Sequence, residues 1–160
     1  RSQMHYGSLS GSYEADSLNL VTFSYDFYTW RDNSHGTSSF VMLDAAQVPV
    51  YSYNTLDKSL SKYGSHSVGV DYQHSFKKKD ELLTVSYKFD KSPKRTQTET
   101  TYSDVVSVPF LTYAQGQDNK SHIAEHTVQV DYVNPINEHH YVDAGMKFIA
   151  RKNASNSQTP

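Results

Sequence analysis

The chain contains three hairpin-like repeats whose short turns all fall at the same end of the strands. In each repeat, a segment of alternating apolar and polar residues enters a short polar turn, and a second alternating segment follows. The connections between the repeats are much longer, from about Arg31 to Ser65 and from about Lys91 to Ser121. Turns this short cannot carry a parallel crossover, so the pattern predicts an antiparallel meander. The expected turns are Ala15 to Leu18, Lys77 to Asp80 and Asn134 to His139.

The alternation has a period of two, which places successive side chains on opposite faces of a strand. From Val21 to Phe27 the odd-numbered residues are apolar or aromatic and the even-numbered residues are polar. The segments that alternate in this way have about the 9 to 11 residues of a tilted membrane-spanning strand. Six crossing strands are therefore expected, near residues 5–14, 19–30, 66–76, 81–91, 124–133 and 140–151.

Parts of the long connections also have strand character. Thr37 to Leu43 and Val48 to Tyr53 flank Asp44 to Gln47, and we expect them to be strand extensions closed by a further turn. Val105 to Tyr113 could pair in a similar way, although Pro109 favours an edge or a break.

Composition agrees with a folded, strand-rich chain. The 160 residues are 36% hydrophobic and 13% aromatic, with 13 Tyr and 7 Phe, and such residues favour pleated sheets. The net charge of -2 gives no electrostatic reason to expect a nucleic-acid partner, and the one basic run, Lys77 to Lys79, lies in a turn. The absence of Cys excludes disulfides and thiol chemistry. The mean hydropathy of -0.69 does not argue against a membrane barrel, in which only alternate residues meet lipid.

Short turns at one end and long connections at the other are typical of outer-membrane β-barrels, which have tight periplasmic turns and extended outer loops. A soluble β-sandwich is the alternative, because any antiparallel sheet with one solvated face alternates. In a barrel, the apolar face of each strand would contact lipid. The expected lipid-facing residues are Val21, Phe23, Val68, Val70, Tyr72, Leu83, Val85, Tyr87, Val128, Val130, Val142 and Met146.

Several consecutive segments resemble the barrel of the TonB-dependent outer-membrane receptors. Two of the hairpins and one extracellular loop are similar to that family, and the resemblance covers most of the chain, from about Leu9 to Ser155. No piece is a catalytic signature, so its specificity comes from the order of the pieces. They are Val70 to Phe76 with Leu82 to Tyr87, Glu125 to Pro135 with Ala144 to Asn153, and Pro49 to Asn54.

The resemblance implies a Gram-negative outer-membrane receptor that imports a nutrient such as a siderophore or a sugar. Such a receptor has many more strands and a plug domain that contacts TonB, and neither a plug nor a TonB-contacting segment is identifiable here. Six strands are also fewer than the roughly eight of the smallest closed bacterial barrel. We therefore interpret residues 1–160 as a single segment of a barrel wall, taken from a longer receptor in the outer membrane.

The expected partners of the parent receptor are membrane lipid, a small nutrient ligand and, through the absent plug, TonB. An isolated segment would expose its apolar face and its strand edges, so we expect it to curl upon itself or to self-associate. The alternative function is that of a carbohydrate-binding or adhesin-like β-sandwich.

No catalytic residue, metal site or cofactor is expected, and the chain is not expected to be an enzyme. His122 and His126 lie about 13 Å apart along a strand, which is too far for one metal ion. His139 and His140 are in a turn, where successive side chains diverge. Asp71 and Asp131 could form a carboxylate pair only if their strands adjoin, and a wall role is predicted for both. Ligand contacts are instead expected from aromatic residues of the long connections, which are Trp30, Tyr51, Tyr53, Tyr102 and Tyr113.

Overall fold

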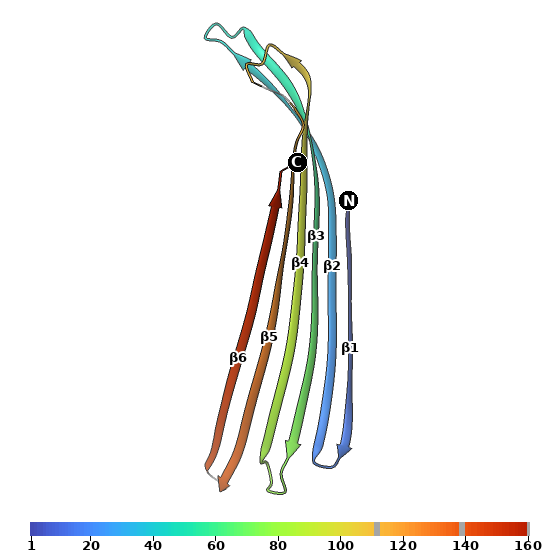
Figure 1. Ribbon diagram of the computed structural model, residues 1–160, viewed down its shortest axis with the longest axis vertical. Helices are drawn as coiled ribbons and strands as arrows, with labels where there is room; N and C mark the ends of the chain where they lie inside the picture. Colours follow the sequence, from blue (N-terminus) through green and yellow to red (C-terminus); the bar gives the residue numbers. More distant parts are fainter. Residues whose placement is uncertain (111–112, 138–139, 160) are drawn as a thin grey trace.

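The computed structural model describes residues 1–110, 113–137 and 140–159, which form one antiparallel sheet (Figure 1). The strand order follows the sequence, and each strand pairs only with its sequence neighbours, which confirms the predicted meander. Within these residues, no helix is long and apolar enough to cross a bilayer. The strands are β1 (Ser2–Asp16), β2 (Asn19–Leu43), β3 (Pro49–Ser75), β4 (Leu82–Val106), β5 (Gln115–Asn137) and β6 (His140–Gln158).

The three predicted short turns connect β1 to β2, β3 to β4 and β5 to β6, all at the lower end in Figure 1. In the first, the Asp16 carboxylate accepts the Leu18 N–H at 2.8 Å. In the second, Asp80 has a φ of 62°, a left-handed conformation that Asp tolerates better than most residues. At the third, β5 continues to Asn137, which pairs with His140 at the start of β6, and Glu138 and His139 are outside the described residues.

The upper halves of the strands are much longer than the sequence predicts. The segments expected to be long connections, residues 31–65 and 91–121, are mostly strand. Stretches of them, such as residues 31–39 and 94–101, have no apolar side chain on either face, but the backbone ladder between neighbouring strands continues whatever the side chains are. The predicted extensions and turn in the first of these segments are confirmed. The β2–β3 hairpin closes at the Asp44 carboxylate, which accepts the N–H groups of Ala46 at 2.9 Å and Val48 at 2.8 Å.

The possible pairing of Val105 to Tyr113 holds only as far as Val106, where β4 ends opposite Ser52. Ser107 has a φ of 52°, which turns the chain away from the ladder. Pro109 has no N–H to donate to a neighbouring strand, so the break favoured by this residue is what the structure shows. Residues 111 and 112 of this segment lie outside the described residues.

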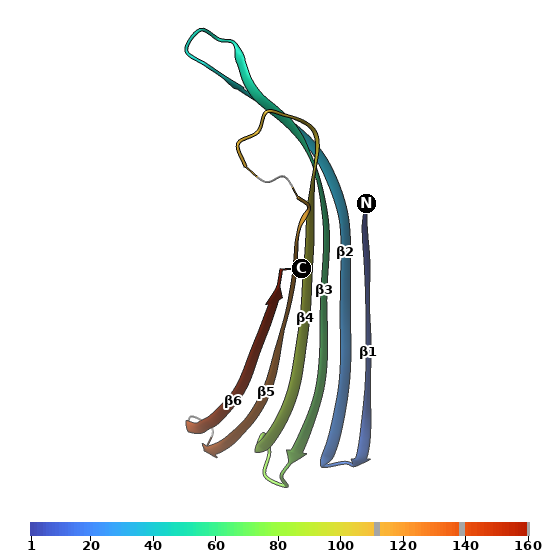
Figure 2. The ribbon, with the colours of Figure 1, turned by 45° about the horizontal axis from the view of Figure 1, so that its top comes forward.

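The sheet is a single curved layer without a hydrophobic core (Figure 2). Among the described residues, no apolar side chain is buried, and the only buried residues are Thr55 and Gly64. A β-sandwich needs a second sheet packed about 10 Å from the first. The sandwich alternative is therefore wrong. The sheet does not curl closed either, because β1 and β6 each pair with one neighbour and not with each other.

Candidate functional site

The register places all twelve residues predicted to face lipid on one face of the sheet. Residues paired across an antiparallel ladder point to the same side. One row across β2 to β6 is Phe23, Val70, Tyr87, Val128 and Phe148. The row nearer the short turns is Val21, Tyr72, Val85, Val130 and Met146.

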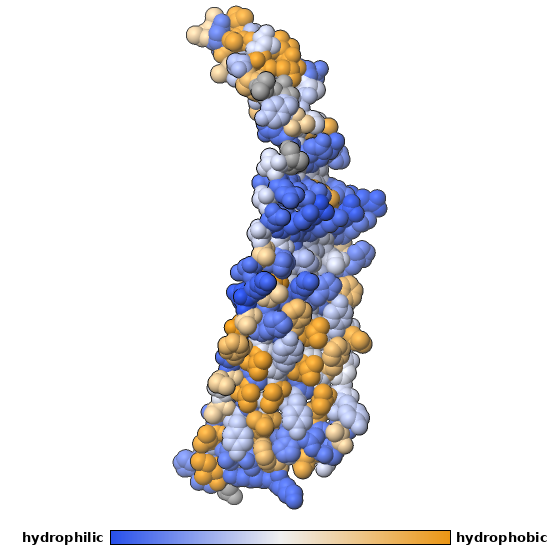
Figure 3. Space-filling model, in the orientation of Figure 1, coloured by the Kyte–Doolittle hydropathy of each residue, from blue (hydrophilic) through white to orange (hydrophobic). Residues whose placement is uncertain are grey.

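We call this surface the apolar band. It comprises Val21, Phe23, Tyr25 and Phe27 of β2. It also includes the residues of β3 to β6 that pair in register with Val21, Phe23 and Tyr25. Leu83 and Val142 form its lower edge. Figure 3 shows hydrophobic residues gathered over the lower part of the sheet and a hydrophilic zone above them. In β1, Leu9 and Tyr13 extend the apolar band as the partners of Tyr25 and Val21.

Aromatic residues with polar tips lie at the lower edge of the apolar band. The Tyr72 hydroxyl donates to Asn19 Oδ1 at 2.6 Å, next to the first short turn. The ring of Phe76 packs edge-on against Tyr132, with centroids 6.1 Å apart. Aromatic rings that keep a hydroxyl near water are typical of the interface between a membrane and water.

Two Tyr–His pairs lie in the upper part of the apolar band and at its upper edge. The hydroxyl of Tyr25 lies 3.0 Å from Nδ1 of His66, between β2 and β3. The hydroxyl of Tyr87 lies 2.8 Å from Nδ1 of His126, in the equivalent place between β4 and β5. Each pair satisfies two polar groups that would be costly to leave unpaired in an apolar environment. The alternation of the sequence does not reveal these pairs, although each Tyr lies on the predicted apolar face.

The opposite face of the sheet is polar and contains two of the four ion pairs of the described residues. Lys88 Nζ lies 3.2 Å from Asp90, and Arg151 binds Glu125 at 2.5 Å. We call it the polar face, and in a closed barrel it would line the interior.

Asp71 and Asp131, which would form a carboxylate pair only if their strands adjoined, lie apart on the polar face. Asp71 pairs in register with Ser86, whereas Asp131 pairs with Thr84 and accepts a hydrogen bond from Gln129 at 2.8 Å. Their strands, β3 and β5, are separated by β4. The strands do not adjoin, so the carboxylates do not form a shared acid–base pair.

An aromatic cluster lies on the polar face at the far end of the β2–β3 hairpin. Tyr53 is at its centre. Its ring stacks on Phe40 with centroids 4.9 Å apart, and it lies 5.7 Å from Tyr102 and 5.6 Å from Phe110. Tyr51 contacts Phe110 edge-on at 6.2 Å. We call these five residues the aromatic cluster.

Three of the predicted ligand contacts, Tyr51, Tyr53 and Tyr102, therefore come together, and two do not. Trp30 is on the same face, but ten residues before Phe40, or about 33 Å along β2, where it pairs with Tyr63. Tyr113 follows β4 and is 63% exposed. Sequence reasoning missed Phe40 and Phe110. The predicted turn at Asp44 to Gln47 could have identified Phe40, because a hairpin centred there places it opposite Tyr51, another member of this group of rings; the observed register places it opposite Tyr53.

A carboxylate lies directly below the aromatic cluster on the same face. Asp57 accepts hydrogen bonds from the hydroxyls of Thr100 at 2.6 Å and Thr55 at 3.2 Å. Thr55 pairs in register with Tyr102, so this polar group adjoins the rings. Aromatic faces beside oriented oxygen acceptors are a combination that small polar ligands use.

The histidines do not form a metal centre within the described part of the chain, where no three His, Asp or Glu residues are placed to hold an ion. His122 and His126 lie on the apolar-band side of β5, and the latter pairs with Tyr87. His139 is outside the described residues, and His140 Nδ1 lies 3.0 Å from Asn137 Oδ1.

A single-layer antiparallel meander with one apolar face, short turns at one end and long hairpins at the other is the wall of a transmembrane β-barrel. Residues 74–159 match the Outer membrane protein beta-barrel family, and the chain belongs to this family. The protein is therefore an outer-membrane protein. No curated protein matches the chain.

Proposed function

We propose that the chain is part of the barrel wall of a TonB-dependent receptor that imports a small nutrient such as a siderophore or a sugar. The apolar band faces lipid, and the polar face lines the interior. TonB acts through a plug domain that is not among these residues. The chain catalyses no covalent chemistry in this function. The resemblance of the two hairpins and the loop segment to these receptors supports the proposal.

The aromatic cluster is the observation that carries the transport proposal. It lies at the end of the sheet opposite the short turns, which in an outer-membrane barrel is the extracellular end. It also lies on the polar face, so the rings border the entrance to the barrel and do not point into lipid. Stacked rings beside the Asp57 carboxylate offer a sugar or a chelate both an apolar face and a hydrogen-bond acceptor.

The test is a pair of variants in the full-length protein. Deleting Gly36 to Tyr53 should abolish uptake, and the milder double substitution Phe40→Ala with Tyr53→Ala should weaken it by about tenfold or more, because each aromatic contact contributes roughly 0.5–1.5 kcal/mol beyond its buried area. Growth on the limiting nutrient measures uptake, and heat-modifiable migration on a gel measures barrel assembly.

The matched control is Tyr141→Ala. Tyr141 is an exposed aromatic residue on the polar face, but it lies beside the short turn between β5 and β6. Uptake should not change in this variant. If the cluster variants assemble and import the nutrient as well as the unmodified protein, the rings pack only against each other and the cluster has no role in ligand capture.

A further inference from the structure

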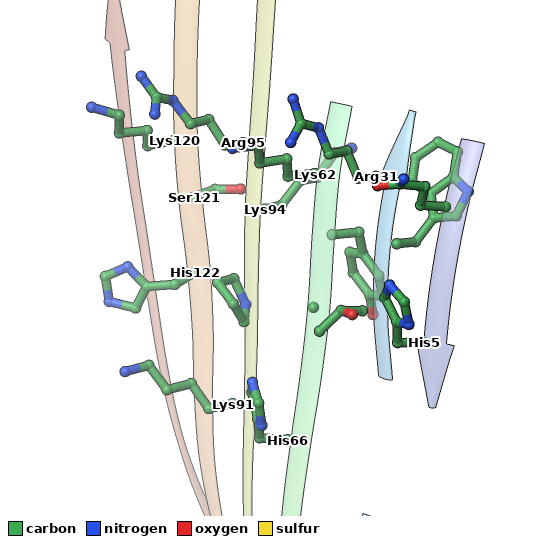
Figure 4. Close-up of a pocket in the computed structure, with 16 residues that line it drawn as sticks. His5, Arg31, Lys62, His66, Lys91, Lys94, Arg95, Lys120, Ser121 and His122 are labelled. Atoms are coloured by element: carbon green, nitrogen blue, oxygen red, sulfur yellow. The ribbon is translucent and has the colours of Figure 1, made fainter. Parts of the chain in front are cut away.

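A row of four basic side chains crosses the sheet directly above the apolar band and on the same face. Arg31 pairs in register with Lys62, Lys62 pairs with Arg95, and Arg95 pairs with Lys120. The four residues come from four neighbouring strands, β2 to β5, and Figure 4 shows them in line across the sheet. We call them the basic row. Neighbouring strands are about 4.8 Å apart, so the row spans about 14 Å.

The surface between the basic row and the apolar band is also free of negative charge. The two register rows below the basic row contain Lys91 and Lys152 together with His5, His66 and His122. All positions of these three rows are described, and none is Asp or Glu. The positive charge is therefore concentrated at one level of the wall.

One carboxylate borders the basic row on the side away from the apolar band. Asp118 binds Arg95 through two hydrogen bonds of 2.9 and 2.6 Å, and Lys120 Nζ lies 3.5 Å from it. The hydrogen bonds from Arg95 lower the pKa of Asp118, so this carboxylate stays ionised and offsets one positive charge. Arg31 and Lys62 form none of the ion pairs of the described residues. The four cations and Asp118 together therefore carry about three net positive charges.

The height of the basic row matches the outer boundary of a bilayer. Ten residues separate Val21, in the lower part of the apolar band, from Arg31. At about 3.3 Å per residue and a strand tilt of about 40°, they span about 25 Å along the barrel axis. The apolar surface of outer-membrane barrels is about 25 Å tall. Lipid headgroups of the outer leaflet would therefore lie at the level of Arg31 and its partners.

The surface is hollowed beside the basic row. A recess of about 800 Å³ is lined by the four cations and by Gly64 and Pro93 below them. Gly64 has no side chain, and a Cβ placed there would lie only 3.2 Å from Pro93 Cγ. The low surface at these two positions leaves room for a bulky polar group between the long basic side chains and the aromatic residues below.

We propose that the basic row binds the phosphate groups of lipid headgroups in the outer leaflet. The inference rests on the lipid-facing orientation of the apolar band in the proposed function. Arginine binds phosphate through paired hydrogen bonds and lysine binds it as a point charge, so the row can contact more than one phosphate at once. Because the row points out of the barrel, it is not on the path of a ligand through the interior.

The experiment measures binding of bis-phosphorylated lipid A and of its dephosphorylated form to the full-length protein by native mass spectrometry in detergent. The test variant carries Arg31→Gln, Lys62→Gln, Arg95→Gln and Lys120→Gln. A Lys or Arg near an anionic surface changes affinity by roughly fivefold, so the loss of four positive charges should weaken binding of the phosphorylated lipid on the order of 500-fold. Dephosphorylated lipid A should bind weakly to both proteins.

The matched control removes three cations from the polar face, through Lys88→Gln, Lys147→Gln and Arg151→Gln. It includes members of two ion pairs, as the test variant does, and should bind the phosphorylated lipid as the unmodified protein does. If the fourfold test variant does not assemble, Arg31→Gln with Lys62→Gln alone should weaken binding roughly 25-fold.

Three results would overturn the proposal. The first is an assembled test variant that binds the phosphorylated lipid with the same affinity as the unmodified protein. The second is dephosphorylated lipid A that binds as tightly as the phosphorylated lipid. The third is displacement of the lipid by inorganic phosphate at the concentration at which the lipid itself binds, which would indicate a site for the free anion. Nutrient uptake and barrel assembly would be unchanged in each of these three cases. Failure of the proposed function would instead appear as uptake that is insensitive to the aromatic cluster.

Discussion

Replacing Val68 with arginine tests which face of the sheet contacts lipid. Val68 lies in the apolar band on β3, between Tyr25 of β2 and Phe89 of β4. An arginine at this position would place a charge among three apolar strands if the band faces lipid. In a sheet with water on both faces, the same substitution would expose the charge to solvent and cost little.

The position of Val68 along the barrel axis sets the expected magnitude. Tyr25, its register partner, is four residues after Val21, which places it about 10 Å above the lower row of the apolar band. The midpoint of a 25 Å band is about 12 Å above that row, so Val68 lies near the bilayer centre. Arginine on the lipid face costs about 2–4 kcal/mol at the midplane and about 0–1 kcal/mol near the interfaces. Val68→Arg should therefore lower the free energy of unfolding by about 2–4 kcal/mol, and Val21→Arg by at most about 1 kcal/mol.

Ser67→Arg is the matched control on the polar face. Ser67 precedes Val68 and pairs in register with Asp26 and Asp90, so an arginine there would face two carboxylates. Its effect should lie within about 0.5 kcal/mol of zero or be stabilising. The assay is denaturant unfolding of the full-length protein in lipid vesicles, followed by heat-modifiable migration. If Ser67→Arg costs as much as Val68→Arg, or if the cost does not fall from Val68 to Val21, the assignment of the two faces is wrong.

Two further predictions concern individual hydrogen bonds. Tyr87→Phe should lower the free energy of unfolding in vesicles by about 1–3 kcal/mol, because His126 loses its hydrogen-bond partner. Adding His126→Leu should recover most of that loss. If the costs of the two substitutions are fully additive, the two residues are not coupled. At the first short turn, hydrogen bonds from the Leu18 N–H and the Asn19 side chain lower the pKa of Asp16, so its contribution to stability is present above about pH 4 and is lost as the pH falls through the lowered value. The hydrogen-exchange protection of the Leu18 amide should decrease on acidification in the unmodified protein, whereas Asp16→Asn should keep this protection at all pH values because its amide oxygen accepts the same bond.

The lower half of the sheet could be predicted from sequence because its side chains record both the strand period and the faces. Between Val21 and Phe27 every second residue is apolar, and the observed register keeps those residues on one side. The upper half could not be predicted in this way. Segments such as Asn33 to Gly36 and Thr96 to Thr98 are polar at every position, so they have no alternation to detect, yet they are hydrogen-bonded strand. Their structure is set by the backbone ladder that the hairpins below begin.

The basic row shows a second limit of sequence reasoning. Arg31, Lys62, Arg95 and Lys120 are spread over most of the chain, and no two of them are adjacent in sequence. The one basic run that is visible in the sequence, Lys77 to Lys79, lies in a turn and forms no such row. Only the register of three consecutive strand pairs brings the four residues together, and a shift of one residue in any pair would move a cation to the other face.

Because each strand contacts only its neighbours in sequence, the sheet is built from hairpins that depend only on the adjacent strands. Among the described strands, β1 pairs with β2 alone, so removing or adding a hairpin at an edge would disturb one ladder and leave the others unchanged. In a protein with a packed core, such an insertion would displace residues throughout the interior. A sheet of this construction can instead gain one hairpin at a time. Gene duplication of a hairpin can therefore change the circumference of the barrel without altering how the other strands pair.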